Sequence, residues 1–381
     1  MKVAMVGPYP VDGVATGGIA AVALALADAL RQLDDIDLHI VTTSTGGAAS
    51  AATTWMHLVP DSGRWRRVTM YRAERTAIAR TLRELRPDVV HAQGQNFFAI
   101  GALDAGLPAV VTLHGMLARE ASIIDRRSRW TERLSKRIRG RFNARFEAAT
   151  LRRARDIIVI SPFVARTIAG GTQARLHAIA NPVDDAFFGL PDAQQDGRLL
   201  YAGTLEPRKG LHDLIEAVRQ LRGRGVHAQL RIAGADADPG YAASLRAAAS
   251  GVGDGVRFLG VIGQQQLLDE YAAAALVVMS SVEETSPMLL QQAMAAGKAS
   301  VAPAVGGIPD LVEDGVTGRV VPPADPAALA EAIEALLTDR AARQRIGAEA
   351  RRIAESRFRA QAVARATRDV YRAAAEAQRP R

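Results

Sequence analysis

Cysteine is absent from this chain of 381 residues, so no disulfide can stabilise its fold. The same absence favours a reducing, cytoplasmic location. No apolar run approaches the roughly 20 residues that a membrane-spanning helix needs. The first ten residues, MKVAMVGPYP, contain one short apolar strand that breaks at glycine and proline, so we expect no secretory signal there. These absences predict a cytoplasmic protein that depends on its apolar cores.

Lysine is scarce as well, with four residues, although the formal net charge is +8. The positive charge therefore comes from arginine, and it is concentrated in one segment. From Arg119 to Arg155 there are thirteen basic residues and four acidic ones, a surplus of nine. Because this surplus accounts for the whole net charge, we interpret it as a basic patch.

Part of the basic segment has a helical period. Apolar side chains recur every fourth residue, at Trp130, Leu134, Ile138, Phe142 and Phe146, with arginines beside them at 129, 133, 137, 141 and 145. This pattern is typical of an amphipathic helix with a basic flank. Either the stripe faces the core and the arginines are solvated, or 129–146 lies on an anionic membrane surface at the inner face of the cell membrane. No reader motif accompanies the patch, so we expect no nucleic-acid partner.

Short apolar strands alternate with helical stretches, which predicts parallel sheets covered by helices on both faces. The predicted strands of the first half are 2–6, 37–41, 89–91, 109–113 and 157–160, with a helix over 19–33. The pattern restarts after a polar, breaker-rich segment at 191–197. Strands are then predicted at 198–203, 229–234, 256–259, 276–279, 300–302 and 318–320, and helices at 211–222, 241–249, 264–275, 288–296 and 327–337.

This pattern and length predict two Rossmann-like, doubly wound α/β domains that face each other across a cleft. We place the N-terminal domain at residues 1–188, a linker at 189–197, the C-terminal domain at 198–360 and a C-terminal helix at 361–381. The last helical stretch, from about 343 to 377, is long enough to cross back to the first domain.

Charges of both signs follow two predicted strands of the second domain. Glu284 lies between the strand 276–279 and a helix, at the edge where open α/β folds bind ligands. The helix offers backbone N–H groups and a positive dipole end to an anion. Arg208 and Lys209 stand side by side between a strand and a helix, a pairing suited to a diphosphate, although a solvated pair of loop charges is the alternative. This arrangement predicts a ligand with hydroxyls at one end and phosphate at the other, such as a nucleotide-sugar.

Three motifs resemble a known family: GTLEPRKGLHDLIEA at 203–217, the Glu284 segment, and AVGGIPDLVEDGVTGRVVPPAD at 304–325. In this order and spacing they resemble retaining glycosyltransferases of the GT-B fold, the group-1 or GT4-type enzymes, over essentially the whole chain. The resemblance implies a metal-independent hexosyltransferase with no cofactor, whose donor substrate is a UDP-sugar or a GDP-sugar. It implies a sugar or lipid-linked acceptor in the N-terminal domain, and a role in envelope glycolipid or polysaccharide synthesis.

The resemblance also implies a role for each matching residue. Arg208 and Lys209 would hold the donor diphosphate and stabilise the leaving group. Glu284 would be the first acid of a Glu-x7-Glu motif and would contact sugar hydroxyls, and His114, after the strand 109–113, would face the same sugar. Backbone N–H groups of 286–288 would approach the sugar or phosphate. The other residues implied to bind substrate are Gly17, Gly18, Gly203, Val261, Ile262, Thr285, Ser286, Pro287, Met288 and Gln292, with Gly306 and Gly307 near the nucleotide pocket.

Two residues depart from the family's pattern. Gln292 stands where a second acid usually binds the ribose hydroxyls; its carbonyl is still an acceptor, but the contact would be different. Thr204 stands where many members have an arginine, a charge that Arg208 would supply. His91 also ends a strand and is the alternative to His114, which we favour because Gly115 lets a ligand approach closely. Other functions stay open: a nucleotide-sugar epimerase or a phosphorylase-like enzyme of the same fold, and a catalytically silent nucleotide-sugar-binding protein.

Overall fold

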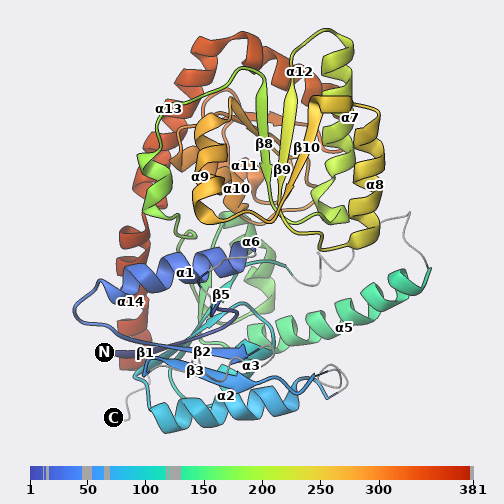
Figure 1. Cartoon of the computed structure of the whole chain (residues 1–381). Helices are drawn as coiled ribbons and strands as arrows, with labels where there is room; N and C mark the ends of the chain where they lie inside the picture. Colours follow the sequence, from blue (N-terminus) through green and yellow to red (C-terminus); the bar gives the residue numbers. More distant parts are fainter. Residues whose placement is uncertain are drawn as a thin grey trace.

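The computed structural model describes residues 1–11, 13, 17–44, 54–63, 69–116, 119 and 130–377, without the side chains of 130–136 and 139. The described chain forms two parallel sheets, one above the other in Figure 1. The first sheet has the strand order β3-β2-β1-β4-β5-β6-β7, and the second has the order β10-β9-β8-β11-β12-β13. All neighbouring strands in both sheets run parallel, so the predicted fold class is confirmed.

In the first sheet, helices cover both faces. Its strands are β1 (Lys2–Val6), β2 (Asp37–Ser44), β3 (Met56–Pro60), β4 (Val89–Gln93), β5 (Ala109–Leu113), β6 (Asp156–Val159) and β7 (Arg175–Ala178). Its helices are α1 (Gly18–Arg31), α2 (Arg72–Leu85), α3 (Phe97–Asp104), α5 (Trp130–Arg153) and α6 (Pro162–Ile168). Because side chains alternate along a strand, Val3 and Met5 pack with α1 whereas Ala4 and Val6 pack with α2 and α3.

The second sheet is built in the same way. Its strands are β8 (Arg198–Ala202), β9 (Gln229–Ala233), β10 (Val256–Gly260), β11 (Leu276–Val278), β12 (Ser300–Pro303) and β13 (Arg319–Val321). Its helices are α7 (Leu211–Gly223), α8 (Pro239–Ser250), α9 (Gln264–Ala273), α10 (Met288–Ala295), α11 (Ile308–Leu311), α12 (Pro326–Thr338) and α13 (Arg340–Arg357). Helices α7, α8 and α12 cover one face, and α9 and α10 cover the other, with α13 packed outside α10.

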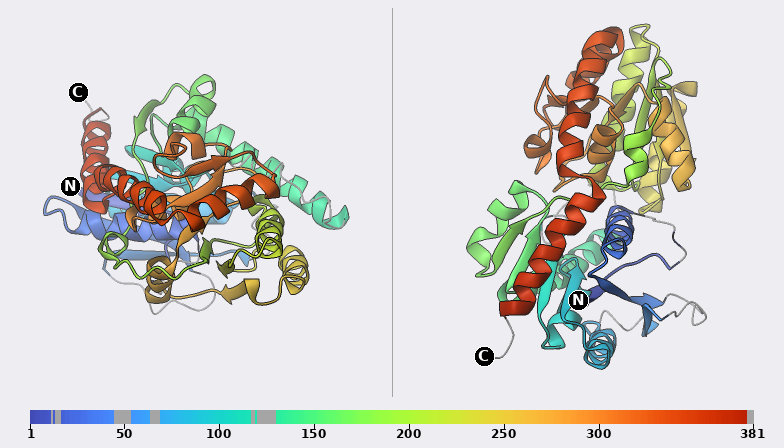
Figure 2. Two further views of the ribbon diagram at one scale, coloured as in Figure 1. Left: turned by 90° about the horizontal axis from the view of Figure 1, so that it is seen from above. Right: turned by 90° about the vertical axis from the view of Figure 1, so that its left-hand side faces the viewer.

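The helical stretch predicted from about 343 to 377 is interrupted and forms two helices, α13 and α14 (Ala360–Ala377), of which α14 makes the predicted crossing back to the first domain. The helix breaks at Phe358, whose side chain is buried and whose carbonyl accepts a hydrogen bond from Val183 N at 2.8 Å. That bond joins the two places where the chain passes between the sheets. Beyond the break, α14 packs against α1 and the first sheet through Val363 and Tyr371 (Figure 2).

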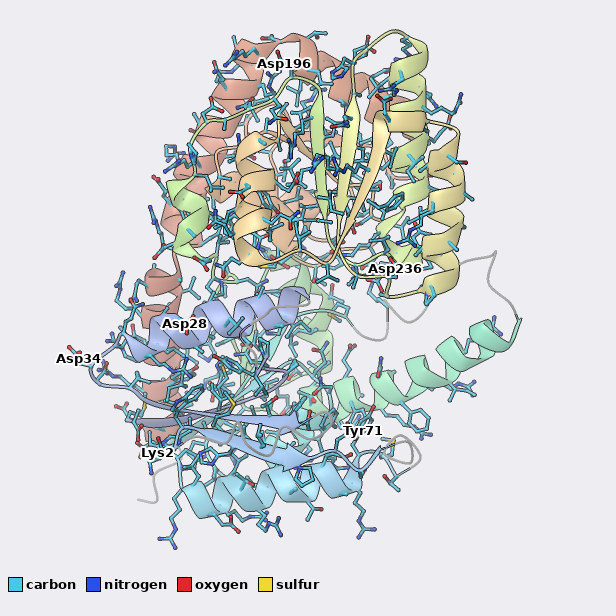
Figure 3. The ribbon with its side chains drawn as sticks, viewed as in Figure 1. Lys2, Asp28, Asp34, Tyr71, Asp196 and Asp236 are labelled. Carbon is cyan, nitrogen blue, oxygen red and sulfur yellow. The ribbon has the colours of Figure 1, made fainter. Side chains whose placement is uncertain are left out.

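The carboxyl ends of the strands in both sheets point to the boundary between them. Asp196, before β8, lies at the far end of the second domain, whereas Asp236, after β9, lies near the first domain (Figure 3). The Thr285 hydroxyl, beyond β11, donates to the carbonyl of His114, beyond β5, at 3.0 Å. The boundary therefore brings together the two strand ends that carry the predicted site.

Candidate active site

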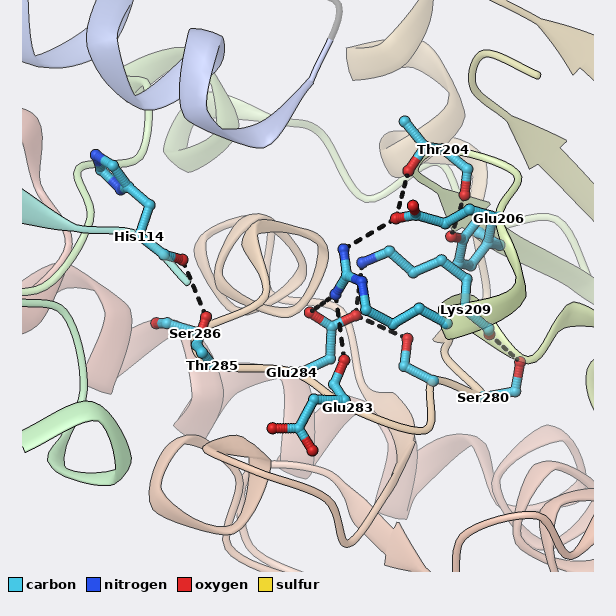
Figure 4. Close-up of polar contacts among 12 residues, drawn as sticks. His114, Thr204, Glu206, Lys209, Ser280, Glu283, Glu284, Thr285 and Ser286 are labelled. Carbon is cyan, nitrogen blue, oxygen red and sulfur yellow. Dashed lines mark hydrogen bonds and ion pairs between the residues drawn. The ribbon is translucent and has the colours of Figure 1, made fainter. Parts of the chain in front are cut away.

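Glu284 is the centre of a buried cluster of charges in the loop that follows β11 (Figure 4). Lys209 Nζ lies 2.6 Å from its Oε1, and Arg208 Nη1 lies 3.3 Å from its Oε2. The Ser281 hydroxyl donates to the same Oε1 at 2.8 Å. Burial raises the pKa of the Glu284 carboxyl, but Lys209 and Arg208 outweigh burial and hold that pKa below its usual range. The carboxylate is therefore charged and fixed, with both cations beside it.

The loop that carries the two cations is attached to the Glu284 loop through backbone contacts. Arg208 and Lys209 lie in a 3-10 turn, η5 (Pro207–Lys209), that ends at Gly210 with a φ of +61°. A Cβ at Gly210 would overlap the Ser280 carbonyl oxygen, so only glycine fits this approach. Val282 N donates to the Arg208 carbonyl at 2.9 Å, on the other side of the same contact. The fold thus fixes the spacing between Lys209 and Glu284 although 75 residues separate them in sequence.

Two helix N-termini meet beside this cluster. Helix α1 begins after Gly17 and helix α10 begins after Pro287, and neither helix has a side-chain cap or an acidic residue in its first turn. A methyl group at Gly18 would lie 3.7 Å from Met288 Cγ, so the two termini are in contact range. The first N–H groups of a helix lack partners within it, and the positive dipole ends favour an anion. Because Pro287 has no N–H, the predicted backbone donors of 286–288 reduce to Ser286 and Met288.

The glycine pair at 306–307 lies against the Glu284 loop. Gly306 has a φ of +52°, and a Cβ there would overlap the Glu284 carbonyl oxygen. Gly307 N donates to that same oxygen at 2.9 Å, and a Cβ at Gly307 would overlap the Thr285 carbonyl. The Ser161 hydroxyl of the first domain also donates to the Thr285 carbonyl, at 2.9 Å. The two glycines therefore support the Glu284 loop, because their backbone packs directly against the loop's carbonyl groups.

His114 reaches the boundary with its backbone, not with its ring. Figure 4 shows the imidazole directed away from Glu284, and its Nε2 lies 2.6 Å from Gln93 Oε1. Burial lowers the pKa of His114 to about 4, and a hydrogen bond with Asn181 acts in the opposite direction. The imidazole is therefore neutral at pH 7, and this arrangement does not place it against the Glu284 cluster.

His91, the alternative to His114, is a core residue. It is fully buried, with Nδ1 at 2.6 Å from Tyr371 Oη on α14 and Nε2 at 2.7 Å from Thr112 Oγ1. Burial, together with a smaller effect of nearby His114, lowers the pKa of His91 to about 3. Both ring nitrogens are thus used inside the first domain.

Gln292 is already engaged within its own domain. The Tyr271 hydroxyl lies 2.9 Å from Gln292 Oε1, the carbonyl that the sequence suggested for the ribose. Tyr271 is fully buried on α9, 21 residues earlier in the chain, so no local motif could have revealed the contact. Ser281 was missed as well, although its position three residues before Glu284 in a loop of small polar residues was a usable signal.

The remaining predicted residues lie at the carboxyl edge of the second sheet. Gly203 follows β8 and is packed against Gly234, where a Cβ would overlap the Gly203 carbonyl. Val261 follows β10 and exposes 60% of its surface, and Ile262 beside it is half-buried. Thr204 donates its hydroxyl to Glu206 at 3.1 Å, and Glu206 accepts from Arg208 at 3.0 Å. The structure therefore puts Arg208 between two carboxylates.

Helix α5 carries the predicted basic stripe and extends away from the first sheet (Figure 1). Of its described side chains, Arg137, Arg141 and Arg145 are exposed, Ile138 is 49% exposed and Phe146 is buried. The prediction for Arg129 lies outside the described residues, as do those for the side chains of Trp130, Arg133 and Leu134. None of the helices in the described ranges is both long and apolar enough to cross a bilayer.

Comparison with known proteins gives a consistent result for both halves. Residues 16–187 match the Glycosyltransferase Family 4 model, and residues 196–339 match the Glycosyl transferases group 1 model. Glycogen synthase of Mycobacterium tuberculosis is 33% identical over 310 residues, which cover 78% of this chain and 72% of that protein. The D-inositol 3-phosphate glycosyltransferase of Streptomyces coelicolor is 36% identical over 229 residues, 58% of this chain and 49% of that protein. This chain therefore matches about half the length of the inositol-phosphate relatives.

Solved structures share the fold. Anabaena HepE, crystallised with UDP and glucose, has a TM-score of 0.76 at 20% identity, over 98% of this chain and 100% of that one. Sucrose-phosphate synthase from Thermosynechococcus elongatus has a TM-score of 0.75 at 23% identity, over 99% of this chain and 100% of that one. Fold and site thus define a GT-B protein of two facing Rossmann-like domains. Within that class, the chain belongs to the group 1, GT4-type glycosyltransferases, as its motifs predicted.

Proposed function

We propose that this protein transfers a sugar from a nucleoside-diphosphate donor to an acceptor, with retention at the anomeric carbon. The observation that carries the proposal is the pairing of Lys209 and Arg208 with a buried Glu284, beside the uncapped N-termini of α1 and α10. Fixed cations and free N–H groups suit a diphosphate, and a carboxylate suits sugar hydroxyls. The HepE structures that hold UDP and UDP-glucose support a uridine nucleotide as the first donor to test.

In the proposed reaction, the bond between the anomeric carbon and the diphosphate breaks as the acceptor oxygen approaches from the same face. The leaving diphosphate takes the acceptor's proton. Lys209 and Arg208 stabilise the charge that grows on the leaving group, and donors of this kind act most strongly in a site that excludes water. Lys209 is suited to this role because 12% of its side chain is exposed and its ammonium is already oriented by Glu284. We propose that these two cations act without a metal.

Donor recognition at the nucleoside end is proposed to differ from that of the family. The Tyr271 hydroxyl already contacts the Gln292 carbonyl, so the ribose would meet a partly engaged amide, with one remaining lone pair and two N–H donors, instead of a carboxylate. The exposed side chain of Val261 offers an apolar surface to a base at the carboxyl end of β10. We expect a weaker ribose contact than a second acid would give, without loss of the phosphate contacts.

A donor screen tests the proposal directly. UDP- and GDP-sugars are incubated with the full chain, with and without a lipid fraction, and nucleotide release is measured. Release that depends on an added acceptor, with an anomeric configuration by NMR that matches the donor, supports a retaining transferase. Product formed without an acceptor would favour the epimerase. The absence of both turnover and calorimetric binding of UDP and GDP would leave a catalytically silent protein.

We propose that helix α5 docks on an anionic membrane and so brings the enzyme to a lipid-linked acceptor of envelope glycolipid or polysaccharide synthesis. The exposed Arg137, Arg141 and Arg145 and the exposed Ile138 on the extending part of the helix support this proposal. Each cation would add about 1 kcal/mol near an anionic surface. Flotation with anionic and neutral vesicles tests it: binding to anionic vesicles should fall when the three arginines are changed to glutamine. Equal failure on both vesicles would leave the arginines as a solvated face.

A further inference from the structure

Gln291, next to the unusual Gln292, is fully buried on α10 and holds the loop that precedes that helix. Its Nε2 donates to the Ser286 hydroxyl at 2.8 Å and to the Ser286 carbonyl at 3.2 Å. Its Oε1 is buried and has no hydrogen-bond partner among the residues that the structure describes. A buried acceptor without a partner costs about 1–3 kcal/mol, so an apolar residue would be expected here if packing alone decided.

The two contacts fix the direction of each hydrogen bond. The Ser286 carbonyl can only accept, so the amide atom facing it must be the nitrogen. That nitrogen has no lone pair to offer, so the Ser286 Oγ must accept from it. The hydroxyl proton of Ser286 therefore stays available and is directed away from Gln291.

Ser286 lies at the boundary between the domains, where such a donor is useful. Thr285, one residue earlier, donates to the His114 carbonyl of the first domain. Met288, two residues later, lies beside Gly18 of the first domain, where an added Cβ would be 3.7 Å from Met288 Cγ. Ser286 itself is half-buried and precedes the first turn of α10. Its proton thus adds a side-chain donor to the N–H groups at the two helix N-termini, where an anion is favoured.

We propose that Gln291 is a positioning residue that turns the Ser286 hydroxyl into a hydrogen-bond donor for a phosphate oxygen of the donor diphosphate. This inference rests on the proposed function, because it takes a diphosphate as the ligand of the boundary. It predicts that the buried Gln291 amide adds ligand affinity with little net gain in stability, because its unpartnered carbonyl offsets its two hydrogen bonds to Ser286. A residue that only supported the loop would increase stability, and it would either increase ligand affinity as well or leave that affinity unchanged.

Inorganic pyrophosphate is a suitable probe, because its binding does not require sugar transfer. Titration calorimetry on the full chain compares wild type with Ser286→Ala, Gln291→Leu and the double variant. We expect each single change to weaken pyrophosphate binding about three- to tenfold, as the loss of one hydrogen bond would. The double variant should bind no more weakly than the weaker single variant, because the two residues act as one unit. Ser286→Thr keeps the hydroxyl and should retain most of the affinity.

Thermal unfolding separates positioning from support. Gln291→Leu should unfold close to the wild-type temperature, because removal of the unpartnered buried carbonyl offsets the loss of the two hydrogen bonds to Ser286, and Gln291→Met serves if leucine does not fit. Gln220→Leu, an amide paired with Glu216 on the distant helix α7, is the matched control and should change neither property. A lower unfolding temperature with unchanged pyrophosphate affinity would overturn the inference, as would additive losses in the double variant.

Nucleotide release by the wild type distinguishes failure of the proposed sugar transfer from failure of the proposed role of Gln291. If the coupling between Ser286 and Gln291 is found but no donor is turned over, the proposed function fails and the inference stands. If the wild type turns over a donor and Gln291→Leu binds pyrophosphate as well as wild type does, the inference alone fails. If the wild type does not bind pyrophosphate at all, the inference is wrong whatever the turnover shows.

Discussion

The two domains contribute different chemistry to their shared boundary. The second domain supplies charged side chains, the half-buried cations Arg208 and Lys209, which both contact the buried carboxylate of Glu284. The first domain supplies two neutral groups to the Thr285 segment, the His114 carbonyl and the Ser161 hydroxyl, while its exposed Arg119 and Arg166 pair with Glu283 and Asp310 of the second domain. Charge is costly to bury and needs fixed partners, whereas neutral backbone contacts form with little loss as two surfaces approach. We infer that the second domain binds the donor diphosphate and stabilises the leaving group, and that the contacts of the first domain align the two sides of the site.

Lys209→Ala should have the largest effect, because it removes the proposed leaving-group stabiliser and leaves Glu284 with one cation. We expect the activation barrier to rise by about 2–4 kcal/mol, a loss of roughly 30- to 1000-fold in kcat measured by nucleotide release. Arg224→Ala is the matched control, since it removes a cation paired with Glu334 at 3.1 Å on the outside of the same domain. Near-wild-type turnover in Lys209→Ala would refute the assignment of charge chemistry to the second domain.

Tyr371→Phe tests the first domain, where we expect stability to change more than chemistry. The change removes the 2.6 Å contact to His91 Nδ1 and leaves that buried ring nitrogen with a longer contact, 3.3 Å to Gln93 Nε2. The free energy of unfolding should fall by about 1–3 kcal/mol in a denaturant titration, because α14 loses a polar contact with the sheet it covers. Tyr9→Phe, on a half-buried residue of the same domain, is the control. A loss of kcat larger than the loss of stability would contradict the division of roles.

The second domain could be predicted more fully than the first, for a physical reason. Its strands are continuous apolar runs between clear breakers, and its charges stand immediately after strand ends, so motif and position agree. In the first domain, β3 and β7 were missed because both are edge strands, and β7 is largely exposed and polar.

The missing parts of the site are contacts between residues far apart in sequence. Glycine at position 18 gives no sign of which helix it will meet, and the approach to Met288 depends on how the domains pack. The contact of Tyr271 with Gln292 and the break at Phe358 likewise depend on partners in other elements. Sequence reasoning therefore found the charged half of the boundary and could not find what orients it.

The pH dependence of stability tests the charged cluster of the second domain through Glu284. The folded-state pKa of Glu284 lies below its unfolded value near 4.5, since Lys209 and Arg208 outweigh its burial. Its contribution to stability is therefore complete above pH 4.5 and is lost as the pH falls through the folded-state pKa. The difference in unfolding free energy between wild type and Glu284→Gln should thus shrink on acidification below pH 4.5. Glu376→Gln, at an exposed position, is the control. If the difference in unfolding free energy between wild type and Glu284→Gln grew on acidification, the folded-state pKa of Glu284 would lie above its unfolded value, contrary to the prediction.

Thr285→Val should reduce kcat the least of these changes. It tests most directly whether the first domain aligns the two sides of the site. It removes the 3.0 Å hydrogen bond to the His114 carbonyl but keeps the shape of the side chain and the Ser161 contact to the Thr285 backbone. We expect a loss of about 0.5–1.5 kcal/mol, a few-fold fall in kcat with little change in the Kd for UDP. If the first domain only aligns, the affinity for nucleotide in calorimetry should be preserved while turnover falls. A fall in UDP affinity equal to the fall in kcat would instead mean that the neutral contacts of the first domain contribute to binding.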